Sequence, residues 1–160
     1  MVFGGVAAGL YLDGKLFPGI HYNIVFHLVS FIAGALLLKV VLRISKNTGR
    51  TLAKYGRKGT LKRGETNVLV KEGPYKFMRH PMHLGLMLFP VAIAFLVGSP
   101  SFILIIAPLE ILFMILMIKV FEEPEAIKKF GNDYLEYKKS VPPFCFKKEC
   151  LKELWKNVNK

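Results

Sequence analysis

Negative charge is scarce in this sequence of 160 residues, because 11 Asp and Glu stand against 23 Lys and Arg, a formal net charge of +12. Charge of either sign is almost missing from two long stretches: residues 20–42 carry only Lys39, and residues 84–118 carry only Glu110. Since 52% of the chain is hydrophobic, these stretches exclude a disordered chain and a conventional soluble enzyme. They favour a small integral membrane protein.

Cysteine is scarce as well, since Cys145 and Cys150 are the only two. Two cysteines exclude a disulfide-rich scaffold, and their spacing matches none of the usual zinc motifs. We predict that both are ordinary thiols in a cytosolic tail, where a disulfide is not expected.

The long apolar runs predict the membrane topology. A helix that crosses about 30 Å of hydrocarbon needs about 20 residues, and residues 20–42 supply 23. The second apolar stretch is interrupted at Gly98-Ser99-Pro100, a turn signal that predicts a helical hairpin with arms at residues 84–97 and 101–118. The sequence therefore predicts an all-α integral membrane protein with about three transmembrane helices, one span plus a hairpin.

Basic residues collect outside the apolar runs. Eleven Lys and Arg lie in residues 43–82, and others lie in residues 119–160. Such residues gather on the cytoplasmic side of membranes, so we expect a multi-pass protein in which both regions are cytosolic. Residues 1–12 are too short and too rich in glycine to be assigned as a span. No internal repeat or long linker divides the chain, so residues 1–160 are predicted to be a single domain.

The C-terminal region is predicted to be amphipathic, because apolar residues recur there at helical steps of three and four. The first stripe consists of Ile127, Phe130, Tyr134, Tyr137 and Val141. Leu151, Leu154, Trp155 and Val158 repeat the pattern among lysines, as expected of a helix that lies on an anionic membrane surface.

A dense polar cluster at residues 73–85 stands immediately before the first hairpin arm. Pro81 suits the first turn of a helix, whose unpaired N–H groups attract anions. The cluster therefore outlines a binding site; the alternative is that Arg79 and His80 only anchor the chain at lipid headgroups. His80 and His83 would share a helical face, but no third metal ligand presents itself nearby, so we predict no metal.

Acidic residues occur at two notable places. Glu122 and Glu123 end the last predicted arm, where a helix C-terminus disfavours negative charge unless Arg79 or a bound cation lies close. The alternative is a solvated pair at a helix end. Glu110 lies within an apolar arm, where a carboxylate costs at least about 2.5 kcal/mol. It is either functional or a protonated group bonded to a backbone carbonyl that Pro108 leaves free.

Two further patterns are rejected. Residues 59–66 mimic a phosphate-binding loop, but Glu65 stands where that loop needs lysine and would repel phosphate. The basic run at residues 43–63 adjoins a span, where it fits anionic headgroups better than nucleic acid. No helix-turn-helix, zinc finger or aromatic RNA platform accompanies it, so no nucleic-acid partner is expected.

An ordered set of motifs runs through residues 66–144. It consists of Val68-Leu69-Val70, Gly73-Pro74-Tyr75, Arg79-His80-Pro81 and Gly85, then Glu122-Glu123, Phe130-Gly131, Tyr134, Tyr137 and Val141-Pro142. In order and spacing this set resembles the isoprenylcysteine carboxyl methyltransferase family and its phospholipid methyltransferase relatives.

The resemblance implies a site for S-adenosyl-L-methionine at the cytosolic membrane face, and methyl transfer to a lipophilic acceptor. That acceptor would be an isoprenylcysteine-like carboxylate or a lipid amine, and membrane lipids would surround the site. The implied cofactor-binding residues are the strand-like segment Val68, Leu69 and Val70, together with Tyr75, His80, Pro81, Met82, His83, Gly85, Glu122 and Glu123. The expected catalytic residues are Arg79, Lys119 and Glu123.

The sequence departs from the family at two positions. His83 stands where the family commonly has tyrosine, and only Lys119 is available where carboxyl methyltransferases tend to have arginine before the Glu pair. A carboxylate acceptor needs a cation such as Lys119 or Arg79, whereas an amine needs a base such as His83 or Glu123. Both remain open. The alternatives to a methyltransferase are an NADPH-dependent sterol or steroid reductase and a non-enzymatic lipid-binding membrane protein.

Overall fold

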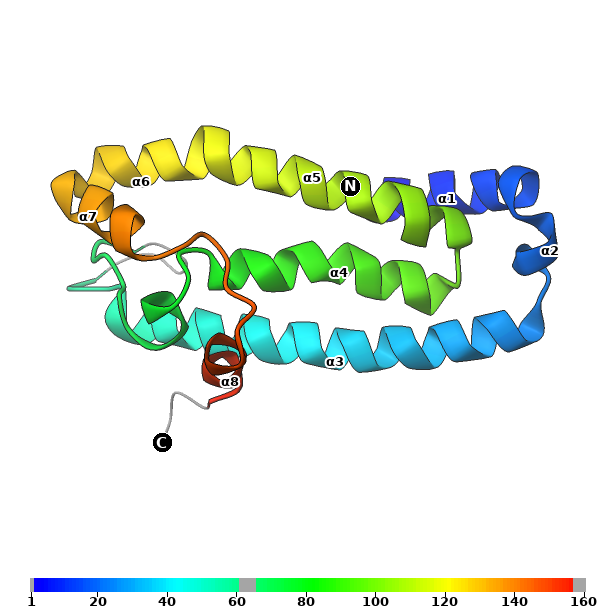
Figure 1. Cartoon of the computed structure of the whole chain (residues 1–160), viewed down its shortest axis with the longest axis horizontal. Helices are drawn as coiled ribbons and strands as arrows, with labels where there is room; N and C mark the ends of the chain where they lie inside the picture. Colours follow the sequence, from blue (N-terminus) through cyan, green and yellow to red (C-terminus); the bar gives the residue numbers. More distant parts are fainter. Residues whose placement is uncertain (1, 61–65, 157–160) are drawn as a thin grey trace. The chain divides into compact units, whose positions relative to one another are not determined.

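The computed structural model describes residues 2–60 and 66–156, which are helical with no strand among them (Figure 1). Part of the phosphate-loop-like pattern at residues 59–66, and Val158 of the predicted tail, lie outside the described residues. The elements are α1 Val2–Leu16, α2 Pro18–His21, α3 Ile24–Tyr55, η1 Gly73–Lys76, α4 Pro81–Val97, η2 Phe102–Ile106, α5 Ala107–Met117, η3 Ile118–Glu122, α6 Glu123–Phe130, α7 Asn132–Ser140 and α8 Lys148–Trp155.

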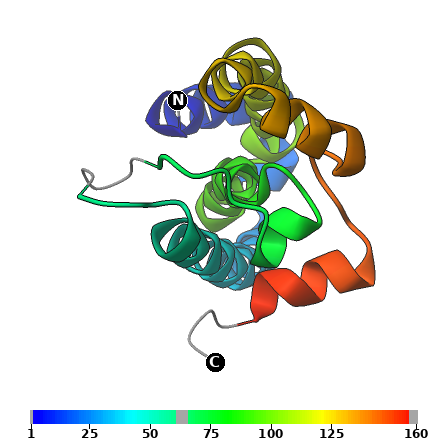
Figure 2. The same cartoon turned by 90° about the vertical axis from the view of Figure 1, so that its left-hand side faces the viewer.

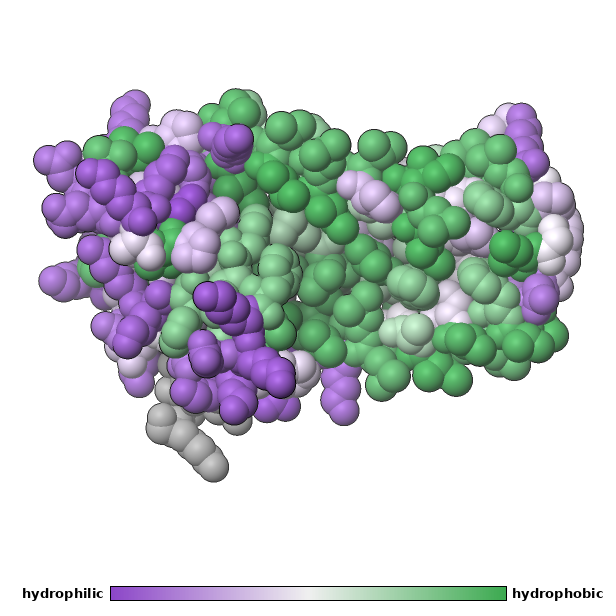
Figure 3. All heavy atoms as spheres, viewed as in Figure 1, coloured by the Kyte–Doolittle hydropathy of each residue, from purple (hydrophilic) through white to green (hydrophobic). Residues whose placement is uncertain are grey.

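Two helices in the described parts of the chain are long and apolar enough to cross a membrane: Ile24–Tyr55 and the continuous run Phe102–Phe130. The helix Pro81–Val97 is also apolar but shorter. Figure 3 shows apolar side chains along α3, α4 and α5, whereas hydrophilic side chains gather around α6, α7 and α8. Large apolar side chains are exposed along α3, including Leu28, Phe31 and Leu36, as expected of a surface that faces lipid.

The first predicted span has different bounds in the structure. Helix α3 begins at Ile24 rather than residue 20, because Asn23 Oδ1 accepts the backbone N–H of Phe26 (3.1 Å) and caps the helix. It continues beyond residue 42 to Tyr55, since Ile44, Asn47, Thr48 and Thr51 bury one face of its basic half.

The predicted hairpin is present, with a turn at Gly98, whose φ of +68° suits glycine. Its second arm was predicted to end at the Glu pair, and that prediction is wrong. The helix runs on to Phe130 through the π-helical segments η2 and η3, each of which ends two residues before a proline, Pro108 or Pro124. A π-turn accommodates the hydrogen bond that proline cannot donate.

One compact unit comprises residues 1–41 and 86–117. Within it α1 packs on the start of the last long helix, where Asp13 Oδ1 accepts the N–H of Ser101 (2.7 Å). Glu110 is buried in this unit, and its Oε2 has no hydrogen-bond partner. This atom therefore does not form the predicted bond to a freed backbone carbonyl.

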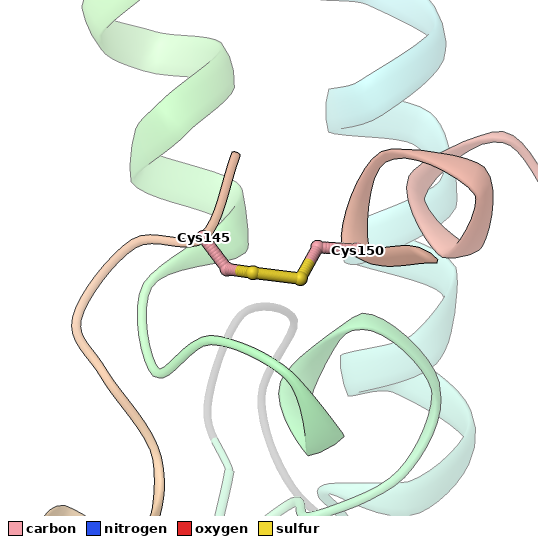
Figure 4. The surroundings of a disulfide bond; sticks show 2 residues. All are labelled: Cys145 and Cys150. Atoms are coloured by element: carbon pink, nitrogen blue, oxygen red, sulfur yellow. A yellow bond between two sulfur atoms is a disulfide. The ribbon is translucent and has the colours of Figure 1, made fainter. Parts of the chain in front are cut away.

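The other compact unit comprises residues 42–85 and 118–160. Here Cys145 and Cys150 form a disulfide (Figure 4), so the prediction of two free thiols is wrong. Helix α8 begins at Lys148, between the two cysteines, and the turn into it brings their Cα atoms to 6.0 Å, a spacing typical of disulfides. Cys150 is buried, and α8 contacts η1.

Replacing Gly34 by alanine should destabilise the protein, because the added Cβ would lie 2.5 Å from the backbone nitrogen of Leu96 on α4. Overpacking of this kind costs about 1–3 kcal/mol. Gly49→Ala is the matched control on α3, since nothing lies within 4 Å of its Cβ and alanine favours the helix by up to about 1 kcal/mol. Thermal unfolding in detergent should rank Gly34→Ala below wild type and Gly49→Ala at or above it. Equal melting of the two variants would contradict this packing.

Candidate functional site

A cavity of about 210 Å³ within the second unit brings together most of the predicted site residues. The predicted residues that line it are Val68, Leu69, Val70, Tyr75, Arg79, His80, Met82, His83 and Glu122. The segment Val68 to Val70 is irregular backbone rather than the predicted strand-like segment.

Four predicted residues do not line this cavity. Pro81 is the first residue of α4, as expected, and is buried. Gly85 allows close packing of α4 on α3, because a Cβ there would lie 2.8 Å from Ser45 Oγ. Lys119 is exposed on η3, and Glu123 is buried beside the cavity lining, bonded to Arg79 and His80.

The cavity also has walls that the cofactor-site prediction omitted. They are Leu52, Thr66, Ala126, Phe130, Tyr134 and Tyr137. Tyr134 and Tyr137, which belong to the predicted apolar stripe, are only 4% and 5% exposed, so the protein itself covers this part of the stripe. The reason is Gly131, whose φ of +57° ends α6 and turns α7 back, so that both rings enter the cavity wall.

Glu123 is the centre of a buried ionic network. Its Oε1 accepts hydrogen bonds from Arg79 Nε (3.0 Å) and Nη2, and Lys138 Nζ donates to Oε2 (2.6 Å). His80 Nε2 lies 3.3 Å from the same Oε1. The side chains of Arg79 and Glu123 are each 7% exposed. A buried carboxylate requires such partners, because desolvation of an unpaired charge is costly.

Arg79 connects this network to the C-terminal segment. Its Nη1 donates to the carbonyls of Lys138 and Val141. The backbone N–H groups of Arg79 and His80 donate to the carbonyls of Pro142 (2.9 Å) and Pro143 (3.1 Å). Arg79 therefore holds residues 138–143 against the start of α4, and most of its donors are used by the protein itself.

His83 and Glu122 form a second pair, on the open side of the network. His83 Nε2 lies 2.7 Å from Glu122 Oε1, with the side chains 18% and 46% exposed. Arg79, the partner expected for the Glu pair, is therefore present at Glu123, where Lys138 joins it, whereas Glu122 is paired with His83, a partner that was not predicted. The alternative of a fully solvated pair does not hold for Glu123.

His80 lies between the two pairs. Its ring packs edge-on to that of His83, with centroids 5.6 Å apart. Burial lowers the pKa of His80 below its ordinary value, against the raising effect of its hydrogen bond to Glu123. His80 is therefore neutral at pH 7.

Three side chains of this region lie close enough together to be candidate ligands of one metal ion. Ligand atoms of His80, His83 and Glu122 all lie within 4.8 Å of one another. Glu122 is the third ligand that the sequence analysis did not find, because it lies 39 residues from His83 in the chain. Two imidazoles and a carboxylate are a donor set that suits a divalent cation such as zinc.

The tyrosines of the wall play different parts. The Tyr137 hydroxyl donates to the carbonyl of Tyr75 and lies 3.4 Å from that of Met78, so it fixes η1. The hydroxyls of Tyr75 and Tyr134 are buried without a hydrogen-bond partner. Burial raises the pKa of Tyr75, so that it remains a phenol able to donate. Unpartnered buried hydroxyls in a cavity wall are the groups that a polar ligand would satisfy.

The comparison with known proteins agrees with this geometry. The family model for phospholipid methyltransferases matches residues 24–133, well over half of the chain. No curated protein and no solved structure matches the chain. The matched residues include the start of α4 with Arg79 and His80, and the helix that carries Glu122 and Glu123. The chain therefore belongs to the phospholipid methyltransferase family.

Proposed function

We propose that this protein transfers a methyl group from S-adenosyl-L-methionine to a lipophilic acceptor at the cytosolic face of the membrane. Family membership establishes a membrane methyltransferase class that acts on lipid. The observation that supports the cofactor is the cavity itself, which is lined by Glu122 and by Tyr75 and Tyr134, two tyrosines whose buried hydroxyls have no hydrogen-bond partner.

The residues present fit the cofactor, whose bound form supplies an electrophilic methyl group on a sulfonium. Glu122 offers a half-exposed carboxylate to an ammonium or to ribose hydroxyls. The first turn of α4 leaves the N–H groups of Met82 and His83 without intrahelical partners, which suits a carboxylate. The apolar side chains of Val68, Leu69 and Val70 supply a wall for an adenine ring. The cavity is smaller than the roughly 300–1,000 Å³ typical of ligand sites, so the cofactor would extend through its mouth.

The remaining predicted residues take different roles in this proposal. Arg79 and Glu123 hold the cavity wall, because their polar groups are bonded to one another and to residues 138–141. His83, oriented by Glu122, is placed to accept a proton from an amine acceptor. Lys119 would be required for a carboxylate acceptor, but it lies outside the cavity lining. This arrangement favours a lipid amine.

The membrane topology in this proposal follows from charge. The spans are α3, α4 and the run that contains α5, with the basic regions at residues 43–82 and 119–160 on the cytosolic side. Residues 1–160 act as one domain, and the lipid acceptor enters from the bilayer.

The cofactor assignment predicts saturable binding of S-adenosylhomocysteine, measured by calorimetry on the detergent-purified protein. Glu122→Gln should weaken binding about tenfold or more, since a charge-assisted hydrogen bond contributes about 1.5–3 kcal/mol. Glu125→Gln is the matched control, because Glu125 is exposed on the same helix outside this cavity. EDTA should leave binding unchanged. Binding of NADPH alone would favour the reductase, and binding of neither compound would favour a non-enzymatic protein. If EDTA abolished the binding of S-adenosylhomocysteine and zinc restored it, a metal site at His80, His83 and Glu122 would be indicated.

The positioning role of Arg79 predicts a stability effect. Arg79→Met should destabilise the protein by about 3–5 kcal/mol, because it leaves the buried Glu123 carboxylate without its main partner. Arg79→Met combined with Glu123→Leu should recover part of that loss, since the unpaired charge is gone. The free energy of unfolding in detergent is measured with the same probe for the wild type, the single variant and the double variant. A single variant with wild-type stability but no cofactor binding would instead place Arg79 in direct contact with the ligand.

The acceptor assignment predicts that His83→Asn reduces methyl transfer to phosphatidylethanolamine by about 10²–10⁴-fold, the usual contribution of a general base. Affinity for S-adenosylhomocysteine should change much less. Transfer of radiolabelled methyl groups to lipid amines and to farnesylcysteine gives the comparison. Preferential methylation of farnesylcysteine, unaffected by His83→Asn, would overturn the amine assignment and direct attention to Lys119.

A further inference from the structure

Helix α8 has two different apolar faces. Cys150 and Leu154 are 3% and 1% exposed and face the protein, whereas Leu151 and Trp155 are 38% and 41% exposed. The exposed pair lines a shallow hollow together with Lys148 and Lys152. The outer face of α8 therefore combines two apolar side chains with two lysines along one edge of them.

Contacts with α3 fix the position of α8 along that helix. The Arg43 guanidinium stacks over the Trp155 ring at 4.9 Å, and its Nη2 donates to the Trp155 carbonyl. One turn further along α3, Asn47 Nδ2 donates to the carbonyl of Leu154 (2.8 Å). Arg43 is the residue at which the apolar run of α3 gives way to its basic half. Figures 1 and 2 show α8 beside this part of α3, and the contacts of Trp155 and Leu154 place the end of α8 beside the change from apolar to basic residues on α3.

The orientation of α8 is also fixed. The disulfide between Cys145 and Cys150 closes the chain at the start of the helix, and the bonds from Arg43 and Asn47 hold its end. These restraints leave Leu151 and the part of Trp155 that Arg43 does not cover exposed on the outer face, with Phe146, 70% exposed, just before the helix.

We propose that α8 is an interfacial anchor that binds anionic phospholipid headgroups. Trp155 and Leu151 enter the headgroup region, where amphipathic aromatic rings are favoured. Lys148 and Lys152 reach lipid phosphates, as lysines beside an apolar face do on anionic membranes. The segment 147–156 has four lysines against Glu149 and Glu153, and Glu153 is paired with Lys156 at 2.5 Å. The net charge of the segment is therefore positive and complementary to anionic lipid.

Trp155 provides a direct probe, because it is the single tryptophan of the chain. The full chain is reconstituted in nanodiscs of phosphatidylcholine with increasing fractions of phosphatidylglycerol. Tryptophan emission is recorded with an aqueous quencher and, separately, with brominated acyl chains. We expect anionic lipid to shift the emission to shorter wavelength, to reduce aqueous quenching and to increase quenching by the brominated chains.

The lysines are then tested with a matched control. Lys148→Ala with Lys152→Ala should raise the phosphatidylglycerol fraction needed for the half-maximal shift, by roughly fivefold for each lysine removed. Lys128→Ala with Lys139→Ala removes the same charge from exposed positions on α6 and α7 and should leave the midpoint unchanged. Thermal unfolding checks that both variants fold.

Two results would overturn the proposal. Trp155 emission that is independent of phosphatidylglycerol, whether the ring is shielded or exposed, would show that α8 does not recognise anionic headgroups. Equal shifts of the midpoint in the α8 variant and in the control would show that general charge, not this face, attracts the lipid. The readout is lipid contact at α8, so neither result depends on the proposed methyl transfer.

Discussion

The buried carboxylate of Glu123 is the constraint on which the candidate site depends. Arg79 binds it from the start of α4 and Lys138 binds it from α7, while His80 lies beside it. A charge that is only 7% exposed is tolerated only with such partners. Because those partners come from segments far apart in the sequence, meeting the needs of this one carboxylate brings α4, α6 and α7 together and thereby encloses the cavity.

The neighbouring carboxylate, Glu122, has a different task because of helix geometry. Successive residues of a helix point about 100° apart, so Glu122 and Glu123 cannot both face Arg79. Glu123 faces Arg79, and Glu122 faces His83 and the cavity. This division requires the helix to continue through the pair, which it does because the π-helical segment η3 precedes Pro124. Had the helix ended at residue 121, neither direction would be fixed.

Local signals in the sequence account for much of this structure, and longer-range contacts account for the rest. The apolar runs, the turn at Gly98 and the helix start at Pro81 were confirmed, because each depends on composition or on one residue's backbone geometry. The continuation of the last helix was missed because the effect of two π-segments cannot be read from hydropathy. The place of Tyr134 and Tyr137 in the cavity wall was not predicted, because an apolar stripe does not say whether lipid or protein covers it. The disulfide was not predicted because the expectation of free thiols was based on a cytosolic location and not on the turn into α8, which brings the two cysteines together.

The anchor and the site are parts of one continuous structure. The chain that leaves α7 passes Val141, whose carbonyl binds Arg79, and the carbonyls of Pro142 and Pro143 bind the backbone of Arg79 and His80. Two residues later Cys145 is covalently joined to α8. A force on α8 is therefore transmitted, through four peptide units and a disulfide, to the residues that begin α4 and line the cavity. A lipid-facing enzyme has to keep its cavity at the depth of the acceptor headgroup. A helix seated at the interface and tied to the cavity wall supplies that constraint.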